Sequence, residues 1–201
     1  MSAGTFEVHE GRQSKGARSD RDRMAATQAE PHLTYDLTVL AADVPSVVSF
    51  AAGWLCDRVR AGWRVTVVVP VGQDVRPLQI MGVDVVTAEP EVDALRGRSA
   101  AAWAVDAAVL DADPDIRYEV KRALDRAQTE ITVWGAAESW AKNRRFTAVR
   151  HRLSAAARAF KQHALLTSGQ DAQVPAVENF LSAALWYAPD GADLVPISAG
   201  E

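Results

Sequence analysis

Short apolar runs alternate with amphipathic segments along the chain from Leu33 to its end. The runs are rich in valine and lack strict apolar–polar alternation, and they lie at 35–41, 63–69, 83–87, 106–110 and 130–134. Continuous runs of this length predict strands that are buried on both faces of a sheet. A short final strand is predicted near 193–197.

Between these runs, apolar residues recur every three or four positions, which is the spacing of one helix face. Asp43 and Pro45 mark the start of a first helix, and Gly62 marks its end. Further helices are predicted around 77–81, 116–127, 146–166 and 175–186, with a helical turn at 100–104.

This alternation of buried strands and helices is typical of βαβ units. We therefore predict a single Rossmann-like α/β domain of three layers over residues 33–201, with a mainly parallel sheet of five to six strands. Ligands of such sheets bind beyond the carboxyl ends of the strands. Functional residues are expected in the loops after the first and fourth strands.

The first 32 residues are polar and carry charges of both signs, so we predict a disordered tail. The net charge of the whole chain is -4, which does not favour nucleic acid as a partner. No apolar run approaches the roughly 18 residues that a membrane span needs, and no secretory signal is visible, so a cytoplasmic location is expected. A single cysteine, Cys56, excludes an intramolecular disulfide and a multi-cysteine zinc site.

Several familiar sites are missing from the sequence. The first strand–helix loop reads AADVPS and contains no glycine, so it is neither a dinucleotide-binding turn nor a phosphate loop. There is no G-x-S-x-G motif for an acyl-transfer serine.

What remains near the predicted strand ends is a set of carboxylates. Asp43 follows the first strand, and Asp111, Asp113 and Asp115 follow the fourth. If the two loops face each other, Asp43, Asp113 and Asp115 form an oxygen site that suits Mg²⁺ or Ca²⁺. The competing interpretation is that these aspartates cap the helices that follow them.

The segment 140–163 is basic and contains no acid. Its cations include Lys142, Arg144, Arg145, Arg150 and Arg152, placed on the polar side of the predicted helix. This pattern is typical of a solvated helix face, and the alternatives are an acidic protein partner or a homodimer contact along the same helix. Trp134 lies at the end of the fifth strand, where it either packs in the core or stacks on a ligand.

Three stretches carry a resemblance to a known family. Ala42-Asp43-Val44-Pro45-Ser46-Val47 follows the first strand, Asp113-Pro114-Asp115-Ile116-Arg117 follows the fourth, and Lys161 and His163 precede Ser168-Gly169-Gln170. In order they resemble the A-H-P-D-D-E, H-P-D-H and late Ser-Gln segments of the PIG-L or LmbE-like N-acetylglucosaminyl deacetylases, which use zinc. The spacing agrees around the first stretch and is altered at the last.

The resemblance covers roughly residues 35–170, and it places unsuitable residues at the active positions. The two metal histidines would be Asp43 and Ile116, the metal aspartate would be Ser46, and the general base would be Pro45. Isoleucine and proline neither bind zinc nor move a proton. The resemblance therefore implies a deacetylase fold in which zinc is not expected and no catalytic residue is assigned.

We expect a ligand- or partner-binding module that has lost catalysis, and any surviving activity would be hydrolysis of an N-acetyl sugar. The ligand-binding candidates are Asp43, Ser46, Asp111, Asp113, Asp115, Arg117, Trp134 and His163. One alternative is an enzyme that uses the aspartates and a hard cation on a glycosyl or phosphoryl substrate. Another is an N-terminal domain similar to those of GT-B glycosyltransferases, suggested by GWRVTVVVP.

Overall fold

The computed structural model describes residues 35–96, 100–127, 129–135, 140, 142, 144–183 and 193–197. The chain divides into two units, Met1–Leu33 and Thr34–Glu201, and all described residues belong to the second. The predicted tail, residues 1–32, lies outside the described residues.

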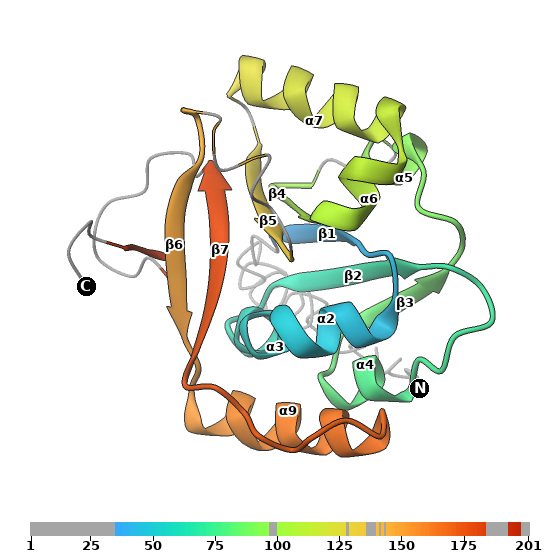
Figure 1. Ribbon diagram of the computed structural model, residues 1–201, viewed down its shortest axis with the longest axis vertical. Coiled ribbons are helices and arrows are strands. Elements are labelled where there is room, and N and C mark those ends of the chain that lie inside the picture. Colours follow the sequence, from blue (N-terminus) through green and yellow to red (C-terminus); the bar gives the residue numbers. More distant parts are fainter. Residues whose placement is uncertain are drawn as a thin grey trace, which may run out of the picture. The chain divides into compact units, whose positions relative to one another are not determined.

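Five parallel strands form one half of the sheet (Figure 1). They are β1 (Asp36–Leu40), β2 (Arg64–Val69), β3 (Asp84–Thr87), β4 (Ala102–Asp106) and β5 (Glu130–Trp134), in the order β3-β2-β1-β4-β5. Every residue of β4 and β5 is buried. These strands form because both of their faces are covered. The predicted burial is wrong for the run 83–87, because it forms β3 at the edge of the sheet, where its residues are exposed or half-buried.

Three antiparallel strands extend this sheet beyond β5. They are β6 (Thr147–Arg152), β7 (Val177–Ala183) and β8 (Val195–Pro196). The later strand β7 lies between β5 and β6, and β8 pairs with the outer side of β6. The described sheet therefore has eight strands in the order β3-β2-β1-β4-β5-β7-β6-β8.

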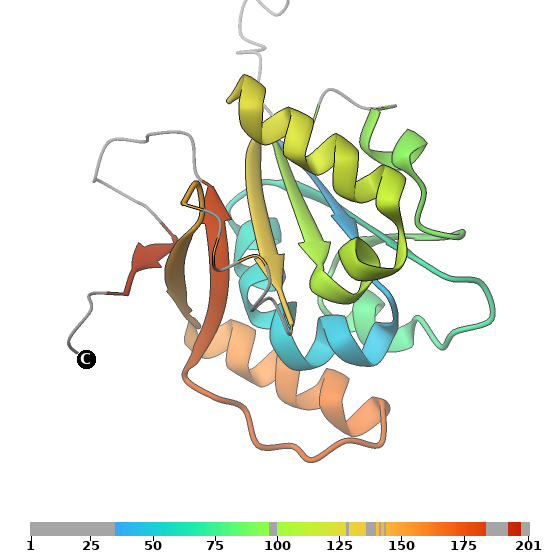
Figure 2. The same cartoon turned by 45° about the horizontal axis from the view of Figure 1, so that its top comes forward.

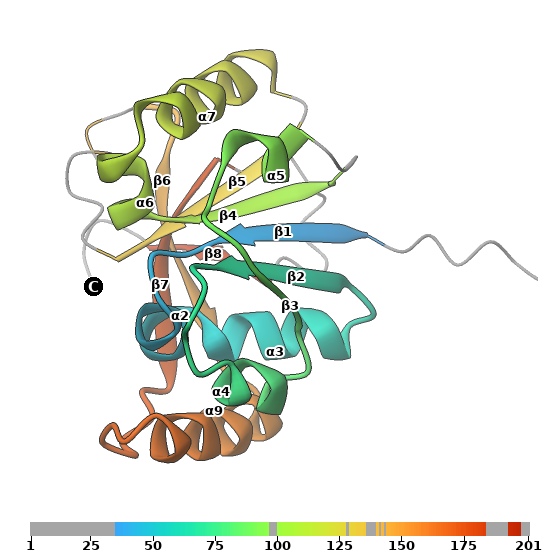
Figure 3. The ribbon, with the colours of Figure 1, turned by 90° about the vertical axis from the view of Figure 1, so that its right-hand side faces the viewer.

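Helices cover both faces of the sheet (Figure 3). One face carries α2 (Val44–Phe50), α3 (Ala52–Arg60), α4 (Arg76–Ile80) and α9 (Ala155–Thr167), and the other carries α5 (Val92–Arg96), α6 (Ala107–Ala112) and α7 (Pro114–Arg126). Each layer has its own apolar core. The predicted Rossmann-like three-layer α/β class is confirmed. Among the described helices, none has the length and apolar character that crossing a membrane requires.

Four predicted elements are wrong in type over part or all of their length. Residues 102–106 form β4 and residues 107–112 form α6, whereas the sequence placed a helical turn at 100–104 and a strand at 106–110. The predicted helix 146–166 is the strand β6 followed by α9. The predicted helix 175–186 overlaps the strand β7. In each case tertiary packing overrides the local apolar spacing.

The predicted first helix is interrupted at Ala51, where the backbone leaves helical geometry with φ -129°. The freed backbone groups bond to a buried ion pair on distant elements. Gly53 N donates to Glu178 Oε1 over 2.9 Å and Trp54 N donates to Oε2 over 2.8 Å. Lys161 Nζ donates to Ser49 O over 2.7 Å and to Glu178 Oε1 over 2.5 Å.

Gly53 is required at this interruption by the close approach of its neighbours. A Cβ atom at this position would lie 2.3 Å from Leu153 Cδ2 and 3.0 Å from Glu178 Oε1. The side chains of Lys161 and Glu178 are each only 1% exposed. The pair therefore supplies hydrogen-bond partners to the backbone groups that the interruption frees, at a point where water does not reach.

We predict that Glu178→Gln lowers the free energy of unfolding by about 3–5 kcal/mol, because it leaves the Lys161 charge buried without its partner. Chemical denaturation measures this loss. Glu89→Gln is the matched control at an exposed position, and it should change the free energy of unfolding by less than about 0.5 kcal/mol. Equal effects of the two variants would show that the pair does not stabilise the interrupted helix.

Candidate functional site

The carboxyl ends of β1, β4 and β5 meet at one edge of the sheet. Leu40 is paired with Val105, and Asp106 is paired with Trp134. The arrowheads of these strands point toward the end where α6 lies (Figure 2). The first and fourth strands are neighbours, which the sequence left as a condition, so ligands of this fold class would bind here. We call this region the carboxyl edge.

A hydrogen-bonded cluster of three side chains lies at the carboxyl edge. Ser46 Oγ donates to Asp106 Oδ2 over 2.5 Å. Trp134 Nε1 donates to Ser46 Oγ over 3.2 Å. Asp106 also caps α6, since its Oδ1 accepts from Ala108 N over 3.0 Å. Asp106 is 3% exposed and Trp134 is 1% exposed, so both bond to Ser46 Oγ rather than to solvent.

Asp43 lies beside this cluster and caps α2. Its Oδ1 accepts from Ser46 N over 2.6 Å. Gln73 Oε1 accepts from Val44 N over 2.6 Å. Asp43, Ser46 and Gln73 are all half-buried, so their side chains line the part of the edge that solvent reaches.

The other predicted aspartates lie one helix further along the chain. Asp113 caps α7 by accepting from Asp115 N over 2.8 Å and from Ile116 N over 3.0 Å. Asp111 and Asp115 are exposed. Arg117 bonds through Nε to Leu110 O over 2.7 Å, at the end of α6. The capping interpretation therefore accounts for both Asp43 and Asp113.

Sequence reasoning missed Asp106, because it placed this residue at the start of a strand instead of at its end. The run AAWAVDAAVL is apolar on both sides of Asp106, so periodicity alone does not divide it into strand and helix. The available signal was Asp106 itself, since a lone aspartate in such a run has the character of a helix cap.

The residues at the positions implied for zinc do not fit that metal. Ile116 is apolar and fully buried, and Ser46 donates its hydroxyl to Asp106. Asp43 has one oxygen engaged with the backbone of α2. In the described part of the chain, no three histidine, cysteine, aspartate or glutamate side chains are grouped so as to hold a metal ion.

The predicted basic helix over 140–163 is not formed as one element. Arg144 and Arg145 lie in a turn, and Arg145 Nη1 donates to Leu124 O over 2.7 Å. Arg150 and Arg152 lie on β6 instead of on a helix. Lys142 is exposed before β6, and His163 is exposed on α9. Trp134 packs in the core, so its ring offers no stacking surface.

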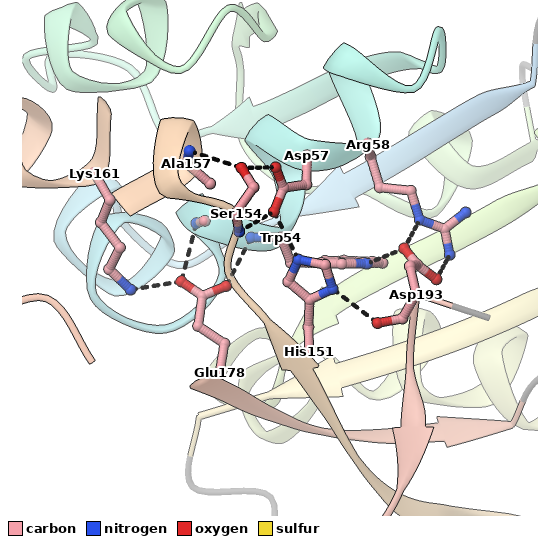
Figure 4. Close-up of polar contacts among 10 residues, drawn as sticks. Trp54, Asp57, Arg58, His151, Ser154, Ala157, Lys161, Glu178 and Asp193 are labelled. Carbon is pink, nitrogen blue, oxygen red and sulfur yellow. Dashed lines mark hydrogen bonds and ion pairs between the residues drawn. The ribbon is translucent and has the colours of Figure 1, made fainter. Parts of the chain in front are cut away.

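A second polar cluster joins α3 to β6 and α9 (Figure 4). Ser154 Oγ donates to Asp57 Oδ1 over 2.6 Å, and His151 Nε2 lies 2.9 Å from Asp57 Oδ2. These are the residue types of a catalytic triad, but serine and histidine both bond to the carboxylate. A nucleophilic serine has to donate to the histidine. Ser154 therefore acts as the cap of α9, where its Oγ accepts from Ala157 N over 3.0 Å.

Two carboxyls near this second cluster have shifted pKa values. Burial alone would raise the pKa of Asp57, but hydrogen bonds from Ser154 and His151 outweigh it and bring the pKa below its ordinary value of 3.8. Burial raises the pKa of Glu130 above its ordinary value, and the charge of Arg58 offsets this only partly.

Comparison with known proteins was made by sequence and by structure. No family model and no curated protein matches the chain. The crystal structure of a deacetylase–teicoplanin complex from the teicoplanin biosynthesis pathway matches with a TM-score of 0.51 and 9% identity, over 73% of this chain and 97% of that chain. The deacetylase–bog complex from the same pathway matches with a TM-score of 0.51 and 10% identity, over the same shares of the two chains.

These matches show the fold of the chain. The protein is a Rossmann-like α/β domain with an antiparallel extension, and its fold is that of the teicoplanin-pathway deacetylases. The deacetylase fold expected from the sequence resemblance is thereby confirmed.

We predict that Ser46→Ala lowers the free energy of unfolding by about 1–3 kcal/mol, because it removes a hydrogen-bond partner from both Asp106 and Trp134 in a buried place. Chemical denaturation is the measurement. Pro45→Ala, at the exposed neighbouring position, is the control and should cost less. An equal cost for the two variants would contradict a stabilising role of the cluster.

We predict that Asp57→Asn lowers the free energy of unfolding by about 1–3 kcal/mol near neutral pH. The pKa of Asp57 is lowered in the folded state, so its contribution is present above 3.8 and is lost as pH falls through the folded value. The difference between wild type and variant should shrink in acid. Asp84→Asn, at an exposed position of β3, is the control. A difference that is constant with pH would be the contrary result.

Proposed function

We propose that this chain is a deacetylase-fold protein that has lost zinc and deacetylase chemistry and binds a ligand or a protein partner at the carboxyl edge. The observation that carries the proposal is the Ser46–Asp106–Trp134 cluster. At the position that the resemblance gives to the metal aspartate, a serine bonds to a buried carboxylate and a buried indole.

The remaining positions support the loss of hydrolysis. Pro45 has no group that accepts a proton from water, and Ile116 has no lone pair for a metal. The resemblance assigns active residues to four positions, which are Asp43, Pro45, Ser46 and Ile116 in this chain. Asp43 is the one ionisable side chain among them, and it caps α2. These four positions therefore supply neither the zinc ligands that would lower the pKa of water nor the general base that the resemblance places at Pro45.

The chemistry of the carboxyl edge favours a ligand rich in hydrogen-bond donors. Asp43 and Gln73 are half-buried acceptors at the start of α2. Near them, hydrogen bonds from Arg76 lower the pKa of Asp74 to about 2, so this exposed carboxylate also stays charged. Sugar hydroxyls and ammonium groups are donors that suit such acceptors.

The proposal is tested by elemental analysis after dialysis against trace zinc, magnesium, manganese and calcium, together with an assay for amine release from N-acetylglucosamine conjugates. We expect no stoichiometric ion and no release. Stoichiometric Mg²⁺ or Ca²⁺ that is lost from Asp43→Ala would instead favour the hard-cation enzyme. Release of amine that is abolished by Asp43→Ala would refute the loss of catalysis.

The binding half of the proposal is tested by titrating the full chain with N-acetylglucosamine and following backbone amide resonances. We expect saturable shifts at Ser46 and Ala108, which lie at the carboxyl edge. The amides of Arg64 and Glu130, at the starts of β2 and β5, are internal controls and should not move. Shifts confined to those controls would place the binding elsewhere.

A further inference from the structure

Three buried donors converge on one residue of the C-terminal segment, beside the start of β5 and away from the carboxyl edge (Figure 4). Trp54 Nε1 donates to Asp193 Oδ2 over 2.8 Å, and Arg58 Nη2 donates to Asp193 Oδ1 over 2.9 Å. His151 Nδ1 lies 2.7 Å from the backbone carbonyl oxygen of Asp193. The donor residues are at most 6% exposed, whereas the side chain of Asp193 is 33% exposed.

The donors are held in place by contacts that do not involve Asp193. The Arg58 guanidinium carbon lies 4.0 Å from the ring centre of Trp63 and 5.3 Å from that of Trp54. Its Nη2 bonds to Glu130 Oε1 over 3.2 Å. Stacking on rings and a buried counter-charge fix the plane of a guanidinium. The donors are therefore arranged for a carboxylate in advance.

Both acceptors that face His151 require a proton from its ring. Nε2 faces a carboxylate oxygen of Asp57, and Nδ1 faces the carbonyl oxygen of Asp193. A neutral imidazole has only one N–H, so it makes one of these two bonds. Asp57 retains that proton on Nε2, because hydrogen bonds to a charged acceptor are the stronger ones. The bond that is lost on deprotonation is the bond to Asp193.

Charged side chains on the neighbouring elements surround His151. Asp57 and Arg58 lie on α3, and Glu178 is the partner of His151 on the neighbouring strand β7. Glu178 is paired with Lys161 of α9, and Arg58 is paired both with Glu130 of β5 and with the carboxylate of Asp193. Both cations are thus engaged by carboxylates, and Asp57 is the carboxylate that bonds to the ring of His151.

We propose that Trp54, Arg58 and His151 form a carboxylate-binding site that holds the chain's own Asp193, and that the site retains residues 193–197 fully only while His151 carries both ring protons. Within the described part of the chain, other contacts of this segment are the burial of Leu194 and the pairing of the segment with β6. Val195 is 49% exposed, and β8 contributes two residue pairs to β6. Loss of the His151 bond therefore loosens the outer edge of the sheet.

The pH dependence is tested by amide hydrogen exchange of the full chain. Ile197 N donates to Ala148 O over 2.9 Å, so its protection factor reports whether the segment is docked. Between an acidic and an alkaline buffer, which leave an imidazole charged and neutral respectively, we expect the protection of Ile197 to fall roughly tenfold. His151→Gln should show the low protection at both pH values, and His163→Gln on exposed α9 should behave as wild type. Protection in folded His151→Gln that follows the wild-type pH profile would overturn the proposal.

The carboxylate site is tested independently with Asp193→Ala, which vacates the site without removing a buried donor. The indole N–H resonance of Trp54 is followed while acetate is added, with chloride at equal ionic strength as the control. We expect a saturable shift with acetate in Asp193→Ala and none in wild type, where Asp193 occupies the site. No saturable shift in the folded variant, or the same shift in both proteins, would overturn the assignment.

Discussion

The structure depends on one buried ion pair, formed by Lys161 and Glu178. This pair bonds to the backbone groups that the interruption at Ala51 leaves without helical partners. It thereby connects the first helical region to α9 and β7, which lie more than a hundred residues further along the chain. Removing one partner would leave both a charge and several peptide groups unsatisfied in a dry place. The pair therefore determines how α2 is directed toward the carboxyl edge and how α3 is directed toward the second polar cluster.

The parallel half of the fold was predictable because four of its five strands are largely buried on both faces, and only the edge strand β3 is not. Runs such as 63–69 consist almost wholly of apolar or β-branched residues, and no helix face has that pattern. The antiparallel half was not predictable in the same way. Phe146, Val149 and Leu153 recur at helical spacing, yet β6 alternates between a buried and a half-exposed face. The decisive fact for β6 is its pairing with β7, which the local sequence does not contain.

The candidate site was predictable in location and only partly in composition. Asp43 and Ser46 lie at the carboxyl edge, as the βαβ pattern requires. Asp106 and Gln73 were missed because their roles depend on where β4 ends and how α2 begins. The expectation of a basic helix face also failed at Lys161, because this cation is buried by its bond to a residue of a later strand. Buried charge has no signature in a single sequence when its partner is distant.

The order of strands in space differs from their order in the chain at β6 and β7, and this has a consequence for assembly. A growing chain that has reached β6 already contains Gly53 and Trp54 but not yet Glu178. Until that carboxylate is present, an uninterrupted helix satisfies more of the backbone than the broken one does. Insertion of β7 between β5 and β6 is therefore coupled to a change in helix geometry far away in the sequence. The last central strand to be synthesised completes the first helical region. Folding is therefore completed by contacts between residues that are far apart in the sequence, and such contacts form slowly.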